Sequence, residues 1–115
     1  MINIVKVNSD KNLILMTRGD TLILKIDIED GDGNAFIPDP NDHLRFALKK
    51  DYNDMVPLIM KDIPVDTCIL RLESEETKRL EQPGEYYYDI QLTYADGIVS
   101  TIIPNAILKI KEEVE

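Results

Sequence analysis

The pattern of apolar and polar positions is most regular between residues 84 and 93. Every second side chain from residue 86 to residue 92 is aromatic or aliphatic, a period of two that is typical of a β-strand with one buried face. The positions expected to face a core are Tyr86, Tyr88, Ile90 and Leu92. The positions between them, among them Tyr87, are expected to face outward.

The same alternation occurs in residues 21–28 and 43–49. The inward positions there are Leu22, Leu24, Ile26, Ile28, Leu44, Phe46 and Leu48. Shorter apolar runs predict further strands at residues 2–7, 13–17, 56–61 and 67–73, and clusters of turn-forming residues separate them. The chain therefore consists mainly of short strands.

Two breaks divide the C-terminal third of the chain. Asp96-Gly97 separates two runs rich in β-branched residues and predicts a tight hairpin turn, in which Gly97 is the second central residue and takes a positive φ. Pro104-Asn105 then interrupts the second run, and a third run begins at Ala106. Two or three strands are expected here.

One short helix is expected near residues 75–82. Ser74 is placed to cap its first turn, and Glu75 and Glu76 lie at the positive end of the helix dipole. Pro83-Gly84 ends it.

Eight or so short strands with so little helix predict an all-β fold, either a β-sandwich or a small barrel. At 115 residues the chain is expected to form a single domain, residues 1–115. No repeat of strand, helix and strand is present, so a parallel doubly wound sheet is excluded.

The charge of the chain narrows the classes of partner. It contains 13 Lys and Arg against 22 Asp and Glu, a formal net charge of −9. Nucleic acids and anionic membrane surfaces repel such a chain, so neither is expected as a partner. The N-terminus lacks a basic segment followed by a long apolar one, so we expect synthesis in the cytoplasm without a signal peptide.

Cys68, the single cysteine, is in phase with Leu70 and Leu72. It is therefore expected to be a small, buried core residue and not a nucleophile, which would need a nearby base.

No group of residues indicates a reaction. His43, the single histidine, is expected on the surface at a strand edge. Glu73, Glu75 and Glu76 have the chemistry of an acid–base pair, but their place at a strand–helix junction is explained by capping. We therefore predict no catalytic residue, no cofactor and no metal site.

Two short motifs match functional signatures by letter only. Residues 30–34 resemble the first half of a calcium loop, but Ala35 and Asn41 stand where an EF-hand loop needs Gly and Glu. Arg18-Gly19-Asp20 matches an integrin-binding tripeptide. Both are interpreted as turns next to strands.

A protein contact is the functional feature that the residues themselves favour. Tyr87, Ile23 and Ile69 are apolar residues at outward positions of three different strands. Scattered apolar side chains are ordinary on a surface, whereas a contiguous patch marks an interface. We take these three residues as the candidate interface.

Several motifs occur in a defined order along the chain. They are Arg18-Gly19-Asp20-Thr21, Asp30-Gly31-Asp32-Gly33-Asn34, Glu76-Thr77 with Leu80, Pro83-Gly84-Glu85-Tyr86, Tyr88-Asp89-Ile90-Gln91-Leu92, Asp96-Gly97, Thr101-Ile102-Ile103-Pro104 and Glu113-Val114. In this order the chain resembles a family of small phage and prophage proteins with an immunoglobulin-like sandwich. The N-terminal domains of baseplate upper proteins from phages of Gram-positive bacteria belong to it.

The resemblance implies an immunoglobulin-like antiparallel β-sandwich and a structural role in a phage tail or baseplate, without enzymatic activity. The expected partners are other tail or baseplate proteins, with a homo-oligomer left open, and the expected location is the virion. A carbohydrate- or ligand-binding β-sandwich module is the alternative. The absence of Trp weighs against sugar binding, because Trp commonly stacks on sugars.

Overall fold

A computed structural model describes residues 3–5, 13–29, 32, 34–51 and 53–111, without the side chains of 3–5, 29 and 103–105. Strands dominate this part of the chain. In chain order the elements are β1 (Asn3–Val5), β2 (Ile14–Thr17), β3 (Leu22–Lys25), β4 (Asp27–Glu29), β5 (His43–Lys49), β6 (Ile59–Ile63), β7 (Ile69–Leu72), α1 (Ser74–Thr77), β8 (Gly84–Thr93) and β9 (Val99–Lys111).

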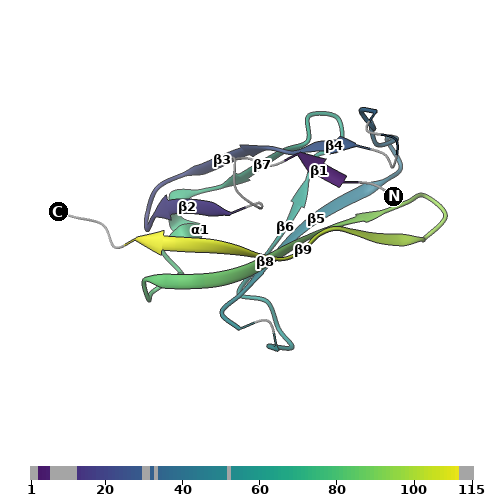
Figure 1. The fold of residues 1–115 in the computed structure, drawn as a ribbon. Coiled ribbons are helices and arrows are strands. Elements are labelled where there is room, and N and C mark those ends of the chain that lie inside the picture. The colour runs from purple at the N-terminus through teal and green to yellow at the C-terminus, as the bar shows by residue number, and fades with distance from the viewer. Residues whose placement is uncertain (1–2, 6–12, 30–31, 33, 52, 112–115) are drawn as a thin grey trace.

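The strands form two layers. One layer is a five-stranded sheet in the order β2-β9-β8-β5-β6, and the other contains the pairs β3-β7 and β1-β4 (Figure 1). Only Ile26 separates β3 from β4, and its N–H donates to the carbonyl of Cys68 at 2.8 Å, so β3 and β4 are two parts of one bent strand. The predicted all-β sandwich is confirmed.

The side chains between the two layers are those that the alternation predicts. All eleven inward positions of residues 21–28, 43–49 and 84–93 are buried, as are Leu70 and Leu72 of β7. The ring of Phe46 packs against that of Tyr88 with 5.5 Å between their centroids. Such burial of aliphatic and aromatic surface is the main force that holds the layers together.

One strand pair differs from the antiparallel sandwich that was expected. β2 runs parallel to β9, with Ile14 opposite Leu108 and Thr17 opposite Lys111. The β8–β9 hairpin leaves one edge of β9 free, and β2 occupies that edge. All other pairs between the described strands are antiparallel.

The predicted break at Pro104-Asn105 is a bulge and not the end of a strand. β9 continues through it, but Tyr88 lies opposite Ala106 whereas Ile90 lies opposite Ile103. Two residues of β9 therefore face Asp89 alone. Proline has no N–H to donate to the ladder, and a bulge accommodates this without ending the strand.

The hairpin turn has a different geometry from the one expected. The N–H of Gly97 donates to the carbonyl of Tyr94 at 2.8 Å, which makes Ala95 and Asp96 the central residues and Gly97 the fourth. Gly97 takes a φ of 91°, so the predicted positive φ is confirmed. This is a tight turn followed by a left-handed glycine, a common three-residue hairpin connection.

The helix is shorter than the expected 75–82. It covers four residues, and its N-cap is Glu73 instead of Ser74. The N–H of Glu73 donates to Oε1 of Glu76 at 2.9 Å. The helix ends early because the chain tightens into a turn, with the N–H of Leu80 donating to the carbonyl of Thr77, and inserts Leu80 into the core.

Candidate functional site

The residues considered for catalysis lie apart from one another. His43 is exposed at the start of β5, whereas Glu73, Glu75 and Glu76 surround the start of α1. Lys61 of β6 donates to Oε1 of Glu76 at 2.6 Å. Burial raises the pKa of Glu76, but the hydrogen bonds from Lys61 and from the Glu73 N–H outweigh it and lower the pKa. Glu76 is therefore held ionised by a structural ion pair.

Cys68 is buried, as predicted, immediately before β7. Its backbone takes a φ of 55°, and its thiol donates to the carbonyl of Val65 at 3.5 Å. Burial is the main cause that raises the pKa of the Cys68 thiol above its ordinary value. A thiol that stays protonated is a poor nucleophile.

The described residues show neither a metal-binding cluster nor a membrane-spanning helix. No three His, Cys, Asp or Glu side chains of this part of the chain lie close enough together to hold a metal ion. The turn at residues 30–34 lies partly outside the described residues, so its interpretation stays a prediction. None of the described residues belongs to a helix with the length and apolarity needed to cross a bilayer.

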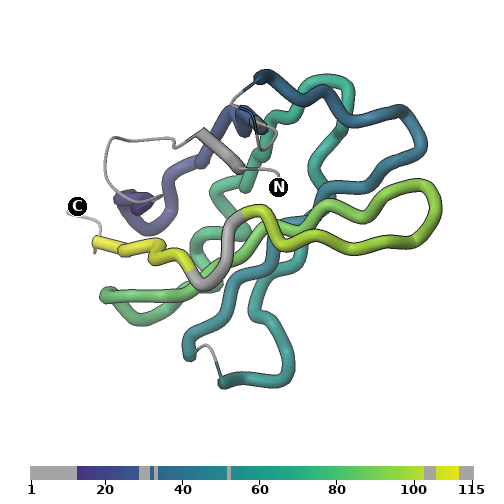
Figure 2. The backbone as a smooth tube through the Cα atoms, turned by 45° about the vertical axis from the view of Figure 1, so that its right-hand side comes forward, coloured from purple at the N-terminus to yellow at the C-terminus, as the bar shows by residue number. Residues whose placement is uncertain are grey.

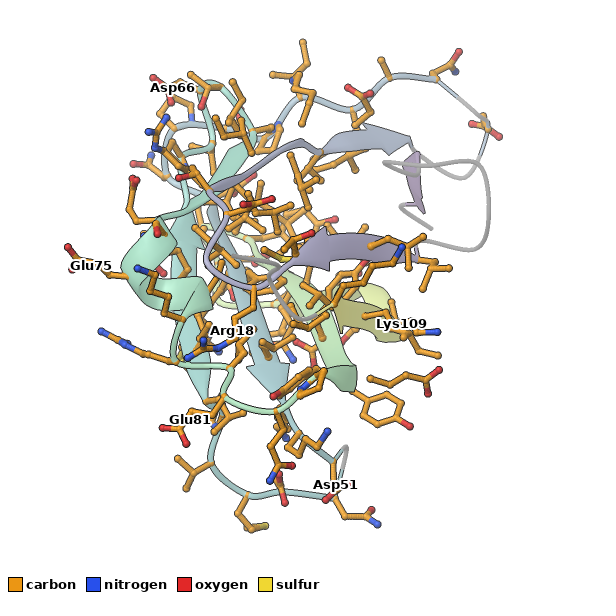
Figure 3. All side chains as sticks on the ribbon, turned by 90° about the vertical axis from the view of Figure 1, so that its left-hand side faces the viewer. Arg18, Asp51, Asp66, Glu75, Glu81 and Lys109 are labelled. Carbon is orange, nitrogen blue, oxygen red and sulfur yellow. The ribbon has the colours of Figure 1, made fainter. Side chains whose placement is uncertain are left out.

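The Arg18-Gly19-Asp20 tripeptide is bound to the segment around α1. Arg18 donates through Nη2 to the carbonyl of Lys78 at 2.7 Å and through Nε to that of Leu80 at 3.1 Å. The N–H of Gly19 donates to the hydroxyl of Thr77 at 3.1 Å. In Figure 3, Arg18 lies directly beside the helix. These bonds give the tripeptide a structural role.

The three candidate interface residues do not form one surface. Ile23 of β3 is 56% exposed and Ile69 of β7 is 39% exposed. Both belong to the same strand pair, in which Ile69 lies opposite Lys25, the next outward position after Ile23. Tyr87 lies on β8 in the other sheet, opposite Lys49 and Ile107, and is half-buried. The expected single patch is thus two patches on opposite outer faces of the sandwich.

The structure shows a different group of exposed apolar residues at the end that carries the β8–β9 turn. We call this the hairpin end and define it as residues 32, 34–42 and 94–99. Ile37, Ile98 and Val99 are 82%, 61% and 55% exposed there. Its two main segments, 34–42 and 94–99, lie side by side (Figure 2).

The two segments of the hairpin end are fixed to each other. The buried carboxylate of Asp42 accepts from the N–H of Asp39 at 2.9 Å and from that of Ala95 at 3.1 Å. The rings of Phe36 and Tyr94 meet edge to face with 6.4 Å between their centroids. The apolar side chains therefore stand on a rigid support.

A second group of exposed apolar residues lies at the opposite end. We call it the groove end and define it as residues 49–51, 53–58 and 78–86. Met55 and Val56 are 91% and 76% exposed on the connection between β5 and β6, which projects below the sandwich in Figure 1. Figure 3 looks at the molecule from the side of α1, with Asp51 and Glu81 of this end at the bottom.

A shallow, open groove of about 350 Å³ lies at the groove end. It is lined by Lys50, Leu58, Arg79, Glu81, Gln82 and Tyr86. The ammonium of Lys50 lies 4.5 Å from the centre of the Tyr86 ring and donates to the carbonyl of Glu85 at 3.3 Å. One wall thus carries a cation held in place by its neighbours.

A cavity of about 540 Å³ lies beside the bend between β3 and β4. Its apolar lining includes Ile26, Ile28, Phe36, Pro38, Val65 and Cys68. Lys25, Asp27 and Asp66 stand among its lining residues as well. An apolar cavity with a few polar groups suits a small ligand.

Sequence reasoning missed both ends, because it assigned residues 56–61 to a strand and 94–99 only to a turn. β6 in fact begins at Ile59, after Pro57, which cannot donate to a ladder. The proline beside Met55 and Val56 was the signal that these residues belong to an exposed loop.

No known protein family matches the chain, and no curated protein matches it.

Proposed function

We propose that the chain is a structural protein of a phage or prophage tail or baseplate that acts through protein–protein contacts and catalyses no reaction. The observation that carries the proposal is the exposure of apolar side chains at both ends. Met55 and Val56 project at one end, and Ile37 and Ile98 at the other. Exposed apolar side chains that lie near one another are typical of surfaces that another protein covers.

Two further features support the phage assignment within this proposal. The order of motifs from Arg18 to Val114 resembles that of small phage and prophage sandwich proteins, and the all-β sandwich agrees with the fold of that family. Tail and baseplate proteins would then be its partners, and the virion its location.

The test is co-purification from an induced lysogen. The tagged chain should retain identified tail or baseplate proteins, and Val56→Ser with Met55→Ser should retain fewer of them. Both side chains are exposed, so the melting temperature should stay within the small range of surface substitutions. The matched control is Met60→Ser, an exposed methionine on the edge strand β6.

Failure of the wild-type chain to retain any virion protein would contradict the phage assignment. Equal retention by the double variant and the wild type would instead remove the groove end from the interface.

A small-molecule-binding module is the second candidate function, and the cavity beside Phe36 and Cys68 is the observation that favours it. Val65→Trp would fill part of this volume. A library of small apolar compounds should then raise the melting temperature of the wild type and not that of the variant. A glycan that binds the chain, with affinity lost in Tyr87→Ala, would favour the carbohydrate-binding version of this function.

A further inference from the structure

We infer that copies of this chain associate head to tail, with the hairpin tip of one copy, residues 94–99, seated in the groove of the next. The inference rests on the proposed function in one respect, namely that the two ends are protein-binding surfaces. It adds the identity of a partner, which is a second copy of the chain.

The hairpin tip is held in one conformation by its own hydrogen bonds. Its turn is closed by the Gly97 N–H to Tyr94 carbonyl bond and by the Tyr94 N–H to Ile98 carbonyl bond, each 2.8 Å long. Oδ1 of Asp96 accepts from the N–H of Ile98 at 3.1 Å. A segment already held in its bound shape loses little conformational entropy on docking.

The tip presents a carboxylate beside exposed apolar side chains. Asp96 is exposed and is followed by Ile98 and Val99, which are also exposed. The whole hairpin end, residues 32, 34–42 and 94–99, contains no Lys or Arg, and three of its four Asp, at positions 32, 39 and 96, are exposed. Its natural complement is a concave surface with cations and apolar walls.

The groove has this complementary chemistry. Two of its six lining residues, Lys50 and Arg79, are cations, against one carboxylate, Glu81. Leu58 provides an apolar wall and is 48% exposed before any partner covers it, whereas Tyr86 also lines the groove but is only 2% exposed. Asp96 of a docked tip would lie near Arg79 and Lys50, and Ile98 would cover Leu58.

Charge balance favours this end over other sites for an acidic tip. The groove end, residues 49–51, 53–58 and 78–86, has four cations and four anions in a chain with a net charge of −9. An acidic tip therefore meets less electrostatic repulsion at the groove end than it would on average over the surface of this acidic chain. The cations are Lys49, Lys50, Lys78 and Arg79, and the anions are Asp51, Asp54, Glu81 and Glu85.

The topology makes such a contact heterologous. β8 begins with Gly84 at the groove end and reaches Thr93 at the hairpin end nine residues later, so tip and groove lie at opposite ends of one strand. Each copy that docks its tip leaves its own groove free for another tip, and repetition builds a row. One tip in one groove is a small contact, so dissociation constants in the range of about 1 μM to 1 mM are expected.

Sedimentation velocity of the purified wild-type chain, from about 10 μM to about 1 mM, tests the inference over that range. The weight-average sedimentation coefficient should rise with concentration past the value of a dimer. Asp96→Lys and Arg79→Glu should each weaken association at least about tenfold, because each places like charges in the contact. Asp96→Asn, which keeps an oxygen for the turn, should weaken it less than Asp96→Lys.

Mixing the two charge-reversal variants tests directly whether the tip of one copy binds the groove of another. Asp96→Lys has an intact groove and Arg79→Glu has an intact tip, so an equimolar mixture should associate more strongly than either variant alone. Asp62→Lys, the same charge change at an exposed position on β6, is the matched control and should leave association unchanged. Melting temperatures of all variants exclude loss of folding.

A wild-type chain that stays monomeric to about 1 mM overturns the inference, as do association that stops at a dimer and a mixture that fails to associate. These outcomes are separable from the test of the proposed function. If the chain stays monomeric but still retains tail proteins, only the proposed head-to-tail association is refuted. A chain that forms rows but retains no tail protein refutes only the phage assignment.

Discussion

At Gly97 the backbone takes a φ of 91°, in the left-handed region that residues with a Cβ rarely adopt. A Cβ atom at this position would have no neighbour within 4 Å, so a side chain there meets only backbone strain. Gly97→Val should therefore lower the free energy of unfolding by about 1–2 kcal/mol in denaturant titrations. Gly97→Asn should cost less, because Asn tolerates positive φ. Unchanged stability of the Val variant would contradict the hairpin geometry.

Burial of Cys68 makes stability depend on alkaline pH. The folded chain binds the thiol proton more tightly than the unfolded chain, because burial raises the folded pKa above the ordinary value of 9.0. This contribution is complete below pH 9 and is lost as the pH rises further, since the unfolded thiol then ionises first. The melting temperature of the wild type should fall more steeply above pH 9 than that of Cys68→Ala. Parallel pH profiles would contradict this.

At the residue scale, the sequence predicts burial well and partners poorly. The alternation of apolar positions identified every inward residue of β3, β5 and β8, because a strand has only two faces. The role of Arg18 could not be predicted in this way. Its side chain binds Leu80, 62 positions away, and local patterns carry no information about such pairs.

At the scale of elements, the segment 18–20 and helix α1 stabilise each other. Thr77 is fully buried, accepts from the Gly19 N–H and donates to the carbonyl of Asp20 at 2.9 Å or of Ser74 at 3.1 Å. The hydroxyl of Ser74 donates to the carbonyl of Gly19 at 2.6 Å. A helix of four residues is not stable alone, so these bonds hold α1 in place.

Replacing Thr77 by the isosteric Val removes the hydroxyl and leaves the shape. The Gly19 N–H then loses its acceptor, and Thr77→Val should lower the free energy of unfolding by about 1–3 kcal/mol. Thr101→Val, at an exposed position of β9, is the control and should change it by less than about 0.5 kcal/mol. If the two substitutions change the free energy of unfolding equally in urea titrations, the structural role of Thr77 is contradicted.

Element boundaries show where sequence reasoning fails. The helix was expected to reach residue 82, but the buried Leu80 and the bonds from Arg18 end it early. Pro104 was expected to break a strand, yet the long pairing of β8 with β9 continues on both sides of it. In both places contacts with distant segments override the local signal.

At the scale of the whole molecule, the candidate interface separates into two independent patches. Ile23 and Ile69 lie on the outer face of β3-β7, and Tyr87 lies on that of the five-stranded sheet. A partner that loses affinity on Ile23→Ser should also lose it on Ile69→Ser and should be unaffected by Tyr87→Ala. Pull-down with each variant measures this. One partner that is sensitive to both faces would contradict the separation, unless it encloses the sandwich.

The sequence did not reveal that these residues lie on different sheets, because it does not show how the strands are divided between the two layers. The period of two says that Tyr87, Ile23 and Ile69 point outward, but it does not say from which sheet. Exposure of Met55 and Val56 was equally hidden, because an apolar run next to a strand resembles part of that strand. The all-β class could be predicted, since it needs only the period and the turns.

The parallel pairing of β2 with β9 has a mechanical consequence. A force that pulls the chain before Ile14 and after Lys111 in opposite directions slides these two strands along each other. The four residue pairs between them then bear the load together, because the pull acts along the strands and not across the ladder. An antiparallel pair pulled apart at its open end would instead lose its hydrogen bonds one after another. The β2–β9 pair is therefore placed to resist a pull that is applied at these two points.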